Sequence, residues 1–280
     1  MTTYFLLSPA KLNLVLQVLR RRKDGFHDIY GIFQKITLFD ELEIVRPKRS
    51  FELIFICEES IPVKENILYK TWRLFKETFQ IKEEIAIKVK KRIPLGAGLG
   101  GGSSNAGTFL RALSKIYEIP EERVLKLSKK IGADVPFFVS PFFSSEVEGI
   151  GDILKPFPNF RAFYLLIYPG FKIETAWAYR ALNLTMEKDP VKYEPTLSPW
   201  ETSQGLINDF KALLYNKYPI YQKYESLLMK EGAKAINITG TGSTIYGVFD
   251  NPPLLSFVRL KKFLNGAKIY LAKNLDGEDQ

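Results

Sequence analysis

The chain has 280 residues, of which 46% are hydrophobic and 25% are charged. This composition is typical of a globular protein with a substantial core and excludes a disordered chain. A single cysteine, Cys57, excludes an internal disulfide framework and a thiolate metal cluster. No apolar run reaches the ~18 residues that span a bilayer, and the first residues lack a secretory signal pattern. We therefore expect a cytoplasmic protein that has no membrane partner.

The formal net charge of +9 suits either nucleic acid or a polyanionic small substrate. The basic residues are spread along the chain, and their one tight cluster is Arg20-Arg21-Arg22-Lys23. Asp24-Gly25 follows this cluster and is a turn signal. The preferred interpretation of the cluster is a solvated hairpin tip. The secondary interpretation is a positively charged patch that attracts the phosphates of a substrate. Nucleic acid is not a predicted partner.

The first half of the chain alternates strand and helix signals. Between Leu12 and Leu19, apolar residues alternate with polar ones, which predicts a half-buried strand with Lys11 and Asn13 side by side on its polar face. Further strands are predicted at 29–45, 51–56 and 85–89. Helices are predicted at 66–79, at 106–117 and at 120–132.

The second half begins near Gly151. Strands are predicted at 162–168, 235–238, 244–249 and 268–272, and helices around Trp177, at 221–230 and at 254–264. Strands and helices that mix without a regular βαβ alternation favour an α+β fold over a doubly wound sheet.

The most informative segment runs from Pro94 to Asn105 and reads PLGAGLGGGSSN. Five glycines lie within seven positions, directly before a predicted helix. Glycines let backbone N–H groups approach an anion without a Cβ atom in the way, and the start of a helix offers further N–H groups to a phosphate. Ser103 and Ser104 add hydroxyl groups. The segment is therefore predicted to bind phosphate, because a flexible linker would not lie between a strand and a patterned helix.

Two better-known phosphate loops do not fit this segment. A Walker A loop requires a lysine before its Ser or Thr, whereas Gly102 directly precedes Ser103. The spacing of Gly96, Gly98 and Gly101 matches the dinucleotide fingerprint, but the following helix leads into a second helix rather than into a parallel strand.

Three motifs in order resemble those of the GHMP kinase superfamily. They are Pro9-Ala10-Lys11-Leu12-Asn13-Leu14, the glycine-rich segment Pro94–Ser104, and Ile238-Thr239-Gly240-Thr241-Gly242-Ser243. Three further features resemble the diphosphocytidyl-methylerythritol kinases within it: Asp24-Gly25-Phe26-His27, Asn66-Ile67-Leu68 and Gly132-Ala133-Asp134-Val135-Pro136-Phe137-Phe138. The resemblance implies an α+β fold of two domains with the active site in the cleft between them. Residues 1–150 would form the ATP-binding domain and residues 151–280 the C-terminal domain.

The resemblance implies phosphoryl transfer from ATP, with Mg²⁺, to a cytidine diphosphate-linked methylerythritol. Asp134 would be the catalytic base and Lys11 its cationic partner, while Asn13 would orient the substrate. Without the resemblance, Asp134 reads as a turn-capping residue, and Lys11 and Asn13 as exposed strand residues.

The implied nucleotide site consists of the glycine-rich segment and one helix start. Its residues are Pro94, Leu95, Gly96, Ala97, Gly98, Leu99, Gly100, Gly101, Gly102, Ser103, Ser104 and Asn66. For Asn66, a helix N-cap is an equal alternative to a contact on the adenine side. The magnesium ligands and the rest of the adenine pocket are not identified by the sequence.

The implied substrate site centres on His27, the only histidine of the chain. His27 would recognise cytosine by hydrogen bonds, and Phe26, where many relatives have tyrosine, would stack on the ring. Tyr179 would cover the second face, with Trp177 as its rival and core packing as the alternative for both. Gly240, Thr241 and Gly242 would pack against the glycine-rich segment and the substrate.

Two other functions are weighed against this one. In another GHMP kinase, of the mevalonate or homoserine type, Phe26 and His27 would have no cytosine ring to bind. An RNA-binding protein would use the positive charge but would leave Lys11 and Asp134 unexplained. The predicted oligomeric state is a monomer or a weak homodimer.

Overall fold

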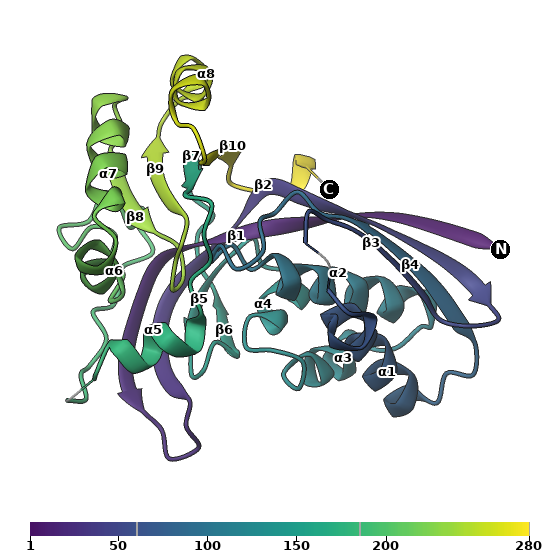
Figure 1. Ribbon diagram of the computed structural model, residues 1–280. Coiled ribbons are helices and arrows are strands. Elements are labelled where there is room, and N and C mark those ends of the chain that lie inside the picture. Colours follow the sequence, from purple (N-terminus) through teal and green to yellow (C-terminus); the bar gives the residue numbers. More distant parts are fainter. Residues whose placement is uncertain (60, 185, 280) are drawn as a thin grey trace. The chain divides into compact units, whose positions relative to one another are not determined.

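The computed structural model describes residues 1–59, 61–184 and 186–279, and it divides into two compact units that interleave along the chain (Figure 1). Unit 1 comprises Met1–Ala10, Phe39–Ile93 and Gly100–Pro141; unit 2 comprises Lys11–Leu38, Pro94–Leu99 and Phe142–Gln280. The units interleave because the first two strands each run from one unit into the other. The domain boundary that the sequence suggests near residue 150 does not coincide with these units and stays a prediction.

Two sheets organise the described residues. The six-stranded sheet has the order β3-β4-β2-β5-β6, with β1 paired to β2, and the four-stranded sheet has the order β10-β7-β9-β8. The strands of the first sheet are β1 (Thr2–Arg21), β2 (His27–Lys48), β3 (Glu52–Ile56), β4 (Glu84–Lys90), β5 (Ser144–Glu148) and β6 (Ile153–Pro156). Those of the second are β7 (Phe163–Tyr168), β8 (Ala235–Ile238), β9 (Ile245–Phe249) and β10 (Lys268–Lys273).

The pairing is antiparallel except between β3 and β4, which are parallel. β2 pairs with β4 through Glu41–Lys48 and with β5 through Gly31–Gln34. One long strand thus contributes to both units.

The core of unit 1 lies between its strands and four helices. These are α1 (Ile67–Phe79), α2 (Gly101–Ile116), α3 (Glu121–Ser128) and α4 (Val135–Val139), and a 3-10 turn, η1 (Val63–Glu65), precedes α1. Trp72 and Phe75 of α1 pack with Phe109 of α2 and with apolar residues of β4 in one buried cluster. This cluster buries the apolar stripes that the sequence predicts for both helices.

Unit 2 contains four further helices, of which α7 and α8 contact the four-stranded sheet. They are α5 (Thr175–Ala181), α6 (Lys211–Lys217), α7 (Ile220–Lys230) and α8 (Leu254–Phe263), and η2 (Gly277–Asp279) follows the last strand. Figure 1 shows α7 beside β8 and β9, and α8 above β10. The fully buried β7 accounts for the continuous apolar run of the sequence at 164–168.

The structure corrects two expectations about elements. β1 is buried on both faces from Ser8 to Val18, not half-buried. Its polar face is buried because the side chains there find partners: the amide of Gln17, for example, donates to and accepts from the backbone of Val191. The helix predicted at 120–132 ends at Ser128. No helix among the described residues has the length and apolarity to cross a membrane.

Candidate active site

Lys11 and Asn13 lie side by side on β1, as the alternation predicts, but both are buried, with 3% and 1% of their surfaces exposed. The Lys11 ammonium donates a hydrogen bond to Oδ1 of Asn13 and lies 4.8 Å from the centre of the Phe33 ring. A lysine this deeply buried is retained only where its charge has partners. This burial rules out the exposed strand lysine as the interpretation of Lys11.

The hydroxyl of Thr239 connects the first motif to the glycine-rich segment. Oγ1 of Thr239 accepts from the backbone N–H of Asn13 at 3.1 Å and lies 3.2 Å from Oδ1 of Asn13. The same hydroxyl lies 3.1 Å from the carbonyl oxygen of Gly98. One side chain of the third motif therefore fixes the other two motifs relative to each other, and all three residues belong to unit 2.

Gly98 is the position of this arrangement that requires glycine. Its φ is +77°, and a Cβ atom there would collide with the carbonyl oxygen of Thr239 and lie 2.8 Å from that of Gly242. Both the left-handed backbone and the lack of space therefore exclude a side chain. Gly240 approaches from the other side, because a Cβ on it would lie 3.2 Å from the Gly98 carbonyl oxygen.

Backbone hydrogen bonds hold the first half of the glycine-rich segment in place. The N–H of Lys11 donates to the carbonyl of Leu99 at 3.0 Å, and the N–H of Thr244 donates to that of Ala97 at 3.1 Å. The aliphatic chain of Lys172 covers Gly96, since its Cγ lies 2.9 Å from where a Cβ would stand. The segment is thus an ordered structure built against two other motifs and not a linker.

The second half of the segment begins α2 in unit 1. Gly101, Gly102 and Ser103 form the first turn of that helix, where the N–H groups lack helical partners. Ser104 is fully buried, and its hydroxyl is bonded to the Ser8 hydroxyl at 2.7 Å and to the Pro9 carbonyl. The Ser104 hydroxyl thus connects α2 to β1, and its contact with nucleotide stays a prediction.

Asn66 is the N-cap of α1. Its Oδ1 accepts from the backbone N–H of Leu68 at 2.9 Å, and the residue is 3% exposed. The structure therefore contains the capping alternative that the sequence left open. A contact between Asn66 and adenine stays a prediction.

Asp134 directly precedes α4 and is partly buried, but its side chain makes no capping hydrogen bond to that helix. The five residues of α4 are all buried, so the carboxylate stands at the edge of an apolar helix. The carboxylate therefore does not cap α4, and the catalytic role of Asp134 stays a prediction.

α4 is held against α2 at a glycine that the sequence analysis did not single out. A Cβ at Gly107 would collide with the Cβ of Phe138 and lie 3.0 Å from its carbonyl carbon. Because α2 begins at the glycine-rich segment and α4 begins at Asp134, this close approach ties two predicted site elements together within unit 1.

His27 and Tyr179 are brought into contact in unit 2. Their ring centres lie 4.7 Å apart with an angle of 31° between the planes, and Tyr179 packs edge-on against Phe210 at 4.9 Å. Trp177 instead lies under the Lys217 ammonium, 3.7 Å from its ring centre. Of the two rivals, Tyr179 is the one beside His27.

Two further features surround this pair. Phe26, at the tip of the β1–β2 hairpin, is 56% exposed. Thr241 of the third motif lies 3.3 Å from Thr175, hydroxyl to hydroxyl, which links that motif to the helix that carries Tyr179.

Partial burial, and secondly the charge of Arg21, lower the pKa of His27 below its ordinary value of 6.5. The imidazole is therefore neutral near pH 7, with one donor and one acceptor nitrogen.

The predicted residues thus form two groups, one in each unit. Unit 1 holds Asn66, the start of α2 and Asp134. Unit 2 holds Lys11, Asn13, residues 94–99, the third motif, His27 and Tyr179. The predicted pairing of Lys11 with Asp134 joins residues of different units and stays a prediction.

Comparisons with known proteins identify the family of this chain. Residues 66–141 match the family described as GHMP kinases N terminal domain. A 4-diphosphocytidyl-2-C-methyl-D-erythritol kinase from Desulfotalea psychrophila is 37% identical over 251 residues, which cover 86% of this chain and 84% of the relative. The chain belongs to the 4-diphosphocytidyl-2-C-methyl-D-erythritol kinase family.

Solved structures support the same assignment. A crystal structure of 4-(cytidine 5'-diphospho)-2C-methyl-D-erythritol kinase has a TM-score of 0.79 and 28% identity, and covers 98% of this chain and 100% of its own. The predicted α+β GHMP kinase fold is therefore confirmed. A homoserine kinase from Cytophaga hutchinsonii, with a TM-score of 0.67, 15% identity and coverage of 98% and 95%, shares the fold alone.

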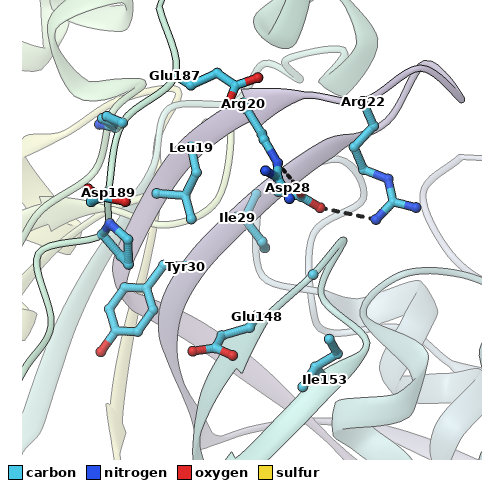
Figure 2. A pocket seen from close by; sticks show the side chains of 13 residues that line it. Leu19, Arg20, Arg22, Asp28, Ile29, Tyr30, Glu148, Ile153, Glu187 and Asp189 are labelled. Carbon is cyan, nitrogen blue, oxygen red and sulfur yellow. Dashed lines mark hydrogen bonds and ion pairs between the residues drawn. The ribbon is translucent and has the colours of Figure 1, made fainter.

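Unit 2 of this kinase also contains a pocket of about 680 Å³ that includes none of the predicted site residues (Figure 2). It lies beside the β1–β2 hairpin and the loop at 187–190. Arg20 and Arg22 on its wall both bond to Asp28, at 2.6 and 3.1 Å, and Arg22 also pairs with Asp24. Two of the four basic residues of the cluster are thus paired with carboxylates of the hairpin, which supports the hairpin-tip interpretation.

Sequence reasoning missed two residues that shape the candidate site: Thr239 as a connecting hydroxyl, and Gly107. Gly107 had a readable signal, because glycine inside a helix costs about 1 kcal/mol relative to alanine and so indicates close packing.

Proposed function

We propose that this protein transfers the γ-phosphoryl group of ATP to the 2-hydroxyl of 4-diphosphocytidyl-2-C-methyl-D-erythritol, a step of the non-mevalonate route to isoprenoid precursors. The observation that carries the proposal is the buried chain of contacts from Lys11 through Asn13 and Thr239 to Gly98. It links the residues predicted to hold the alcohol to the segment predicted to hold the triphosphate. The identity of the substrate in this proposal is taken from the family to which the chain belongs.

The reaction requires in-line positioning, neutralisation of phosphate charge and an acceptor for the hydroxyl proton. Asp134 accepts that proton in our proposal, because the motif at residues 132–138 resembles the one that carries the catalytic aspartate in this family. Lys11 stabilises the negative charge that develops on the attacking oxygen. Asn13, which accepts a hydrogen bond from Lys11, orients both the lysine and the substrate.

The glycine-rich segment holds the triphosphate through backbone N–H groups. Residues 94–99 are ordered by contacts with the first and third motifs, and the start of α2 offers N–H groups and the positive end of its dipole. Because these groups are fixed before ATP arrives, they need little reorganisation when it binds.

A magnesium ion would arrive with ATP and would neutralise charge on its phosphate oxygens. In nucleotide sites this ion keeps several waters and takes few protein oxygens. The described residues contain no group of three His, Cys, Asp or Glu side chains placed to hold a metal, which fits an ion bound mainly by phosphate. Ser103, partly buried in the first turn of α2, is the hydroxyl that we assign to it.

The cytidine end of the substrate binds at the pair of His27 and Tyr179. A neutral imidazole matches the donor and acceptor edge of cytosine, and Tyr179 offers an aromatic face. Phe26, exposed at the hairpin tip, covers the other face of the base. The proposed cytoplasmic location and the predicted monomer or weak homodimer rest on the sequence alone.

One assay tests this function. ADP release is measured with the cytidylylated substrate, with the same alcohol lacking its cytidine diphosphate portion, and with mevalonate and homoserine. We expect turnover of the first compound and little of the others. Equal turnover of the shortened alcohol would remove the role of His27 and Tyr179, and preference for mevalonate or homoserine would overturn the substrate assignment.

A further inference from the structure

Asp40 of β2 is a completely buried carboxylate, at 0% exposure, that the mechanism above does not use. Its Oδ1 accepts from the backbone N–H groups of Arg92 at 2.8 Å and Ile93 at 2.9 Å. Its Oδ2 accepts from the Lys91 ammonium and from the side-chain amide of Asn105 at 2.9 Å. Four donors therefore converge on one ion, as a buried charge requires.

These donors flank the glycine-rich segment. Arg92 and Ile93 immediately precede Pro94, and Asn105 lies in the first part of α2, just after the last glycine of the segment. A single carboxylate thus holds the residues at which the segment begins and those at which it ends. The distance that the intervening glycines must span is set by this bridge.

The Lys91 ammonium lies directly against the start of α2. It donates to Oδ1 of Asn105 at 3.1 Å, and a Cβ on Gly101 would lie only 3.1 Å from its nitrogen. The side chain of Lys91 is 3% exposed, and its charge is paired with Asp40. Gly101 lets the buried ion pair approach the first helical turn this closely.

The network also includes residues of the N-terminal segment of unit 1, Met1–Ala10, which Lys11 follows directly. The Asn105 amide donates to the Ser8 hydroxyl at 3.0 Å, and Ser8 is bonded to Ser104, which in turn donates to the Pro9 carbonyl. Pro9 is two residues before Lys11. All of these contacts lie within unit 1.

We propose that Asp40 is a positioning residue for ATP: it fixes both ends of the glycine-rich segment, so that the N–H groups between them are set for the triphosphate. This inference rests on the proposed function. Asp40 acts through backbone and amide groups and touches neither substrate. Its loss should therefore weaken nucleotide binding and leave the cytidine end of the site unchanged.

The test is Asp40→Asn. The amide oxygen of this variant still accepts from Arg92 and Ile93, but its NH₂ group faces two donors, Lys91 and Asn105, so the hold on α2 is lost. We expect the Kd of a non-hydrolysable ATP analogue and the KM for ATP to rise by about tenfold or more, because displaced N–H groups weaken their charge-assisted hydrogen bonds to phosphate and every 1.4 kcal/mol lost is about tenfold in Kd. The KM for the cytidylylated alcohol should change by less than about twofold.

Two further variants separate positioning from stability. Glu84→Gln removes another carboxylate of unit 1, one bonded to Trp72 and Lys76 at the far end of β4 from the glycine-rich segment; it should lower the melting temperature without changing the KM for ATP. Asp40→Asn combined with Lys91→Met removes the unpaired cation and should regain stability while ATP binding stays weak.

The outcomes are distinct. If Asp40→Asn, or the double variant where the single one does not fold, binds the ATP analogue as tightly as the wild type, Asp40 is only structural and the inference is wrong. The inference is also wrong if Glu84→Gln raises the KM for ATP equally. If the wild-type protein itself neither binds the analogue nor releases ADP, the proposed function fails instead.

Discussion

Asp134 stands at the N-terminal end of α4 without capping it. An aspartate at such a position usually accepts hydrogen bonds from the first turn, so capping does not account for this residue. The catalytic role of Asp134 is a prediction that one substitution tests.

We expect Asp134→Ala to lower kcat by about a hundredfold or more, since a positioned general base contributes on that scale. Binding of a non-hydrolysable ATP analogue should stay within about twofold of the wild type, because the glycine-rich segment is intact. Steady-state ADP release and calorimetric titration measure the two quantities. Full activity of the purified variant would remove Asp134 from the mechanism.

His27 gives the reaction a pH dependence with a definite sign. Its pKa is lowered from 6.5, mainly by burial, so the neutral form is present at neutral pH. Protonation as the pH falls through the lowered pKa adds a second donor where cytosine needs an acceptor. We expect the KM for the cytidylylated alcohol to be flat above pH 6.5 and to rise at lower pH.

The matched variant for this prediction is His27→Gln, which keeps a donor and an acceptor but does not titrate. Its KM should be higher at pH 7 and should not depend on pH between 5 and 7. If wild type and variant show the same rise on acidification, another group is responsible.

For single residues, the sequence predicted neighbours along a strand and missed neighbours across the fold. Lys11 and Asn13 are two residues apart, so strand periodicity places them together. Asp40 meets Arg92 and Asn105 only through tertiary structure, and nothing in the local pattern at residue 40 distinguishes it from an exposed aspartate.

The two predicted site components of unit 1 are Asp134 and the start of α2. Their relative position depends on the contact between the helices α2 and α4. Gly107 has no space for a methyl group beside Phe138. Separation of the two helices would displace Asp134 relative to the start of α2.

We expect Gly107→Ala to destabilise the protein by about 1–3 kcal/mol, the usual cost of overpacking, and to lower kcat at temperatures where the variant is still folded. Urea unfolding and steady-state kinetics measure these effects. Gly277→Ala is the control, because a Cβ at that glycine meets nothing within 4 Å. Unchanged stability of Gly107→Ala would show that the helices tolerate separation.

Elements with strong periodicity were predictable and short ones were not. β8 lies at the predicted residues, and α1 and α8 lie within one residue of their predicted bounds at either end. β5, β6, α4 and α6, which have four to seven residues each, were not predicted. Such segments are too short for a period to be read, and their structure is decided by the partners on which they pack.

Because each of the two units is built from several segments of the chain, neither unit can be produced as one continuous fragment. Unit 2 includes residues from the first 150, and its C-terminal strands bond to them: Tyr246 donates to the Asn13 carbonyl at 3.0 Å and Asn237 to that of Leu14 at 3.4 Å. Removing β1 would leave these buried groups unpaired, at about 1–3 kcal/mol each.

We therefore expect a fragment of residues 151–280 to lack a cooperative thermal transition in circular dichroism, although it contains the whole four-stranded sheet. Co-expression with residues 1–150 should restore a transition. A fragment that melts cooperatively at the temperature of the intact chain would instead support an independent C-terminal domain.

The contact of the only histidine with Tyr179 has a practical consequence. A proton NMR spectrum of this protein contains the imidazole signals of one residue, and the tyrosine ring 4.7 Å away shifts them by its ring current. Any base that enters beside these rings changes that shift. Unlabelled protein in a pH titration therefore reports, in one pair of resonances, both the ionisation of His27 and the arrival of a pyrimidine.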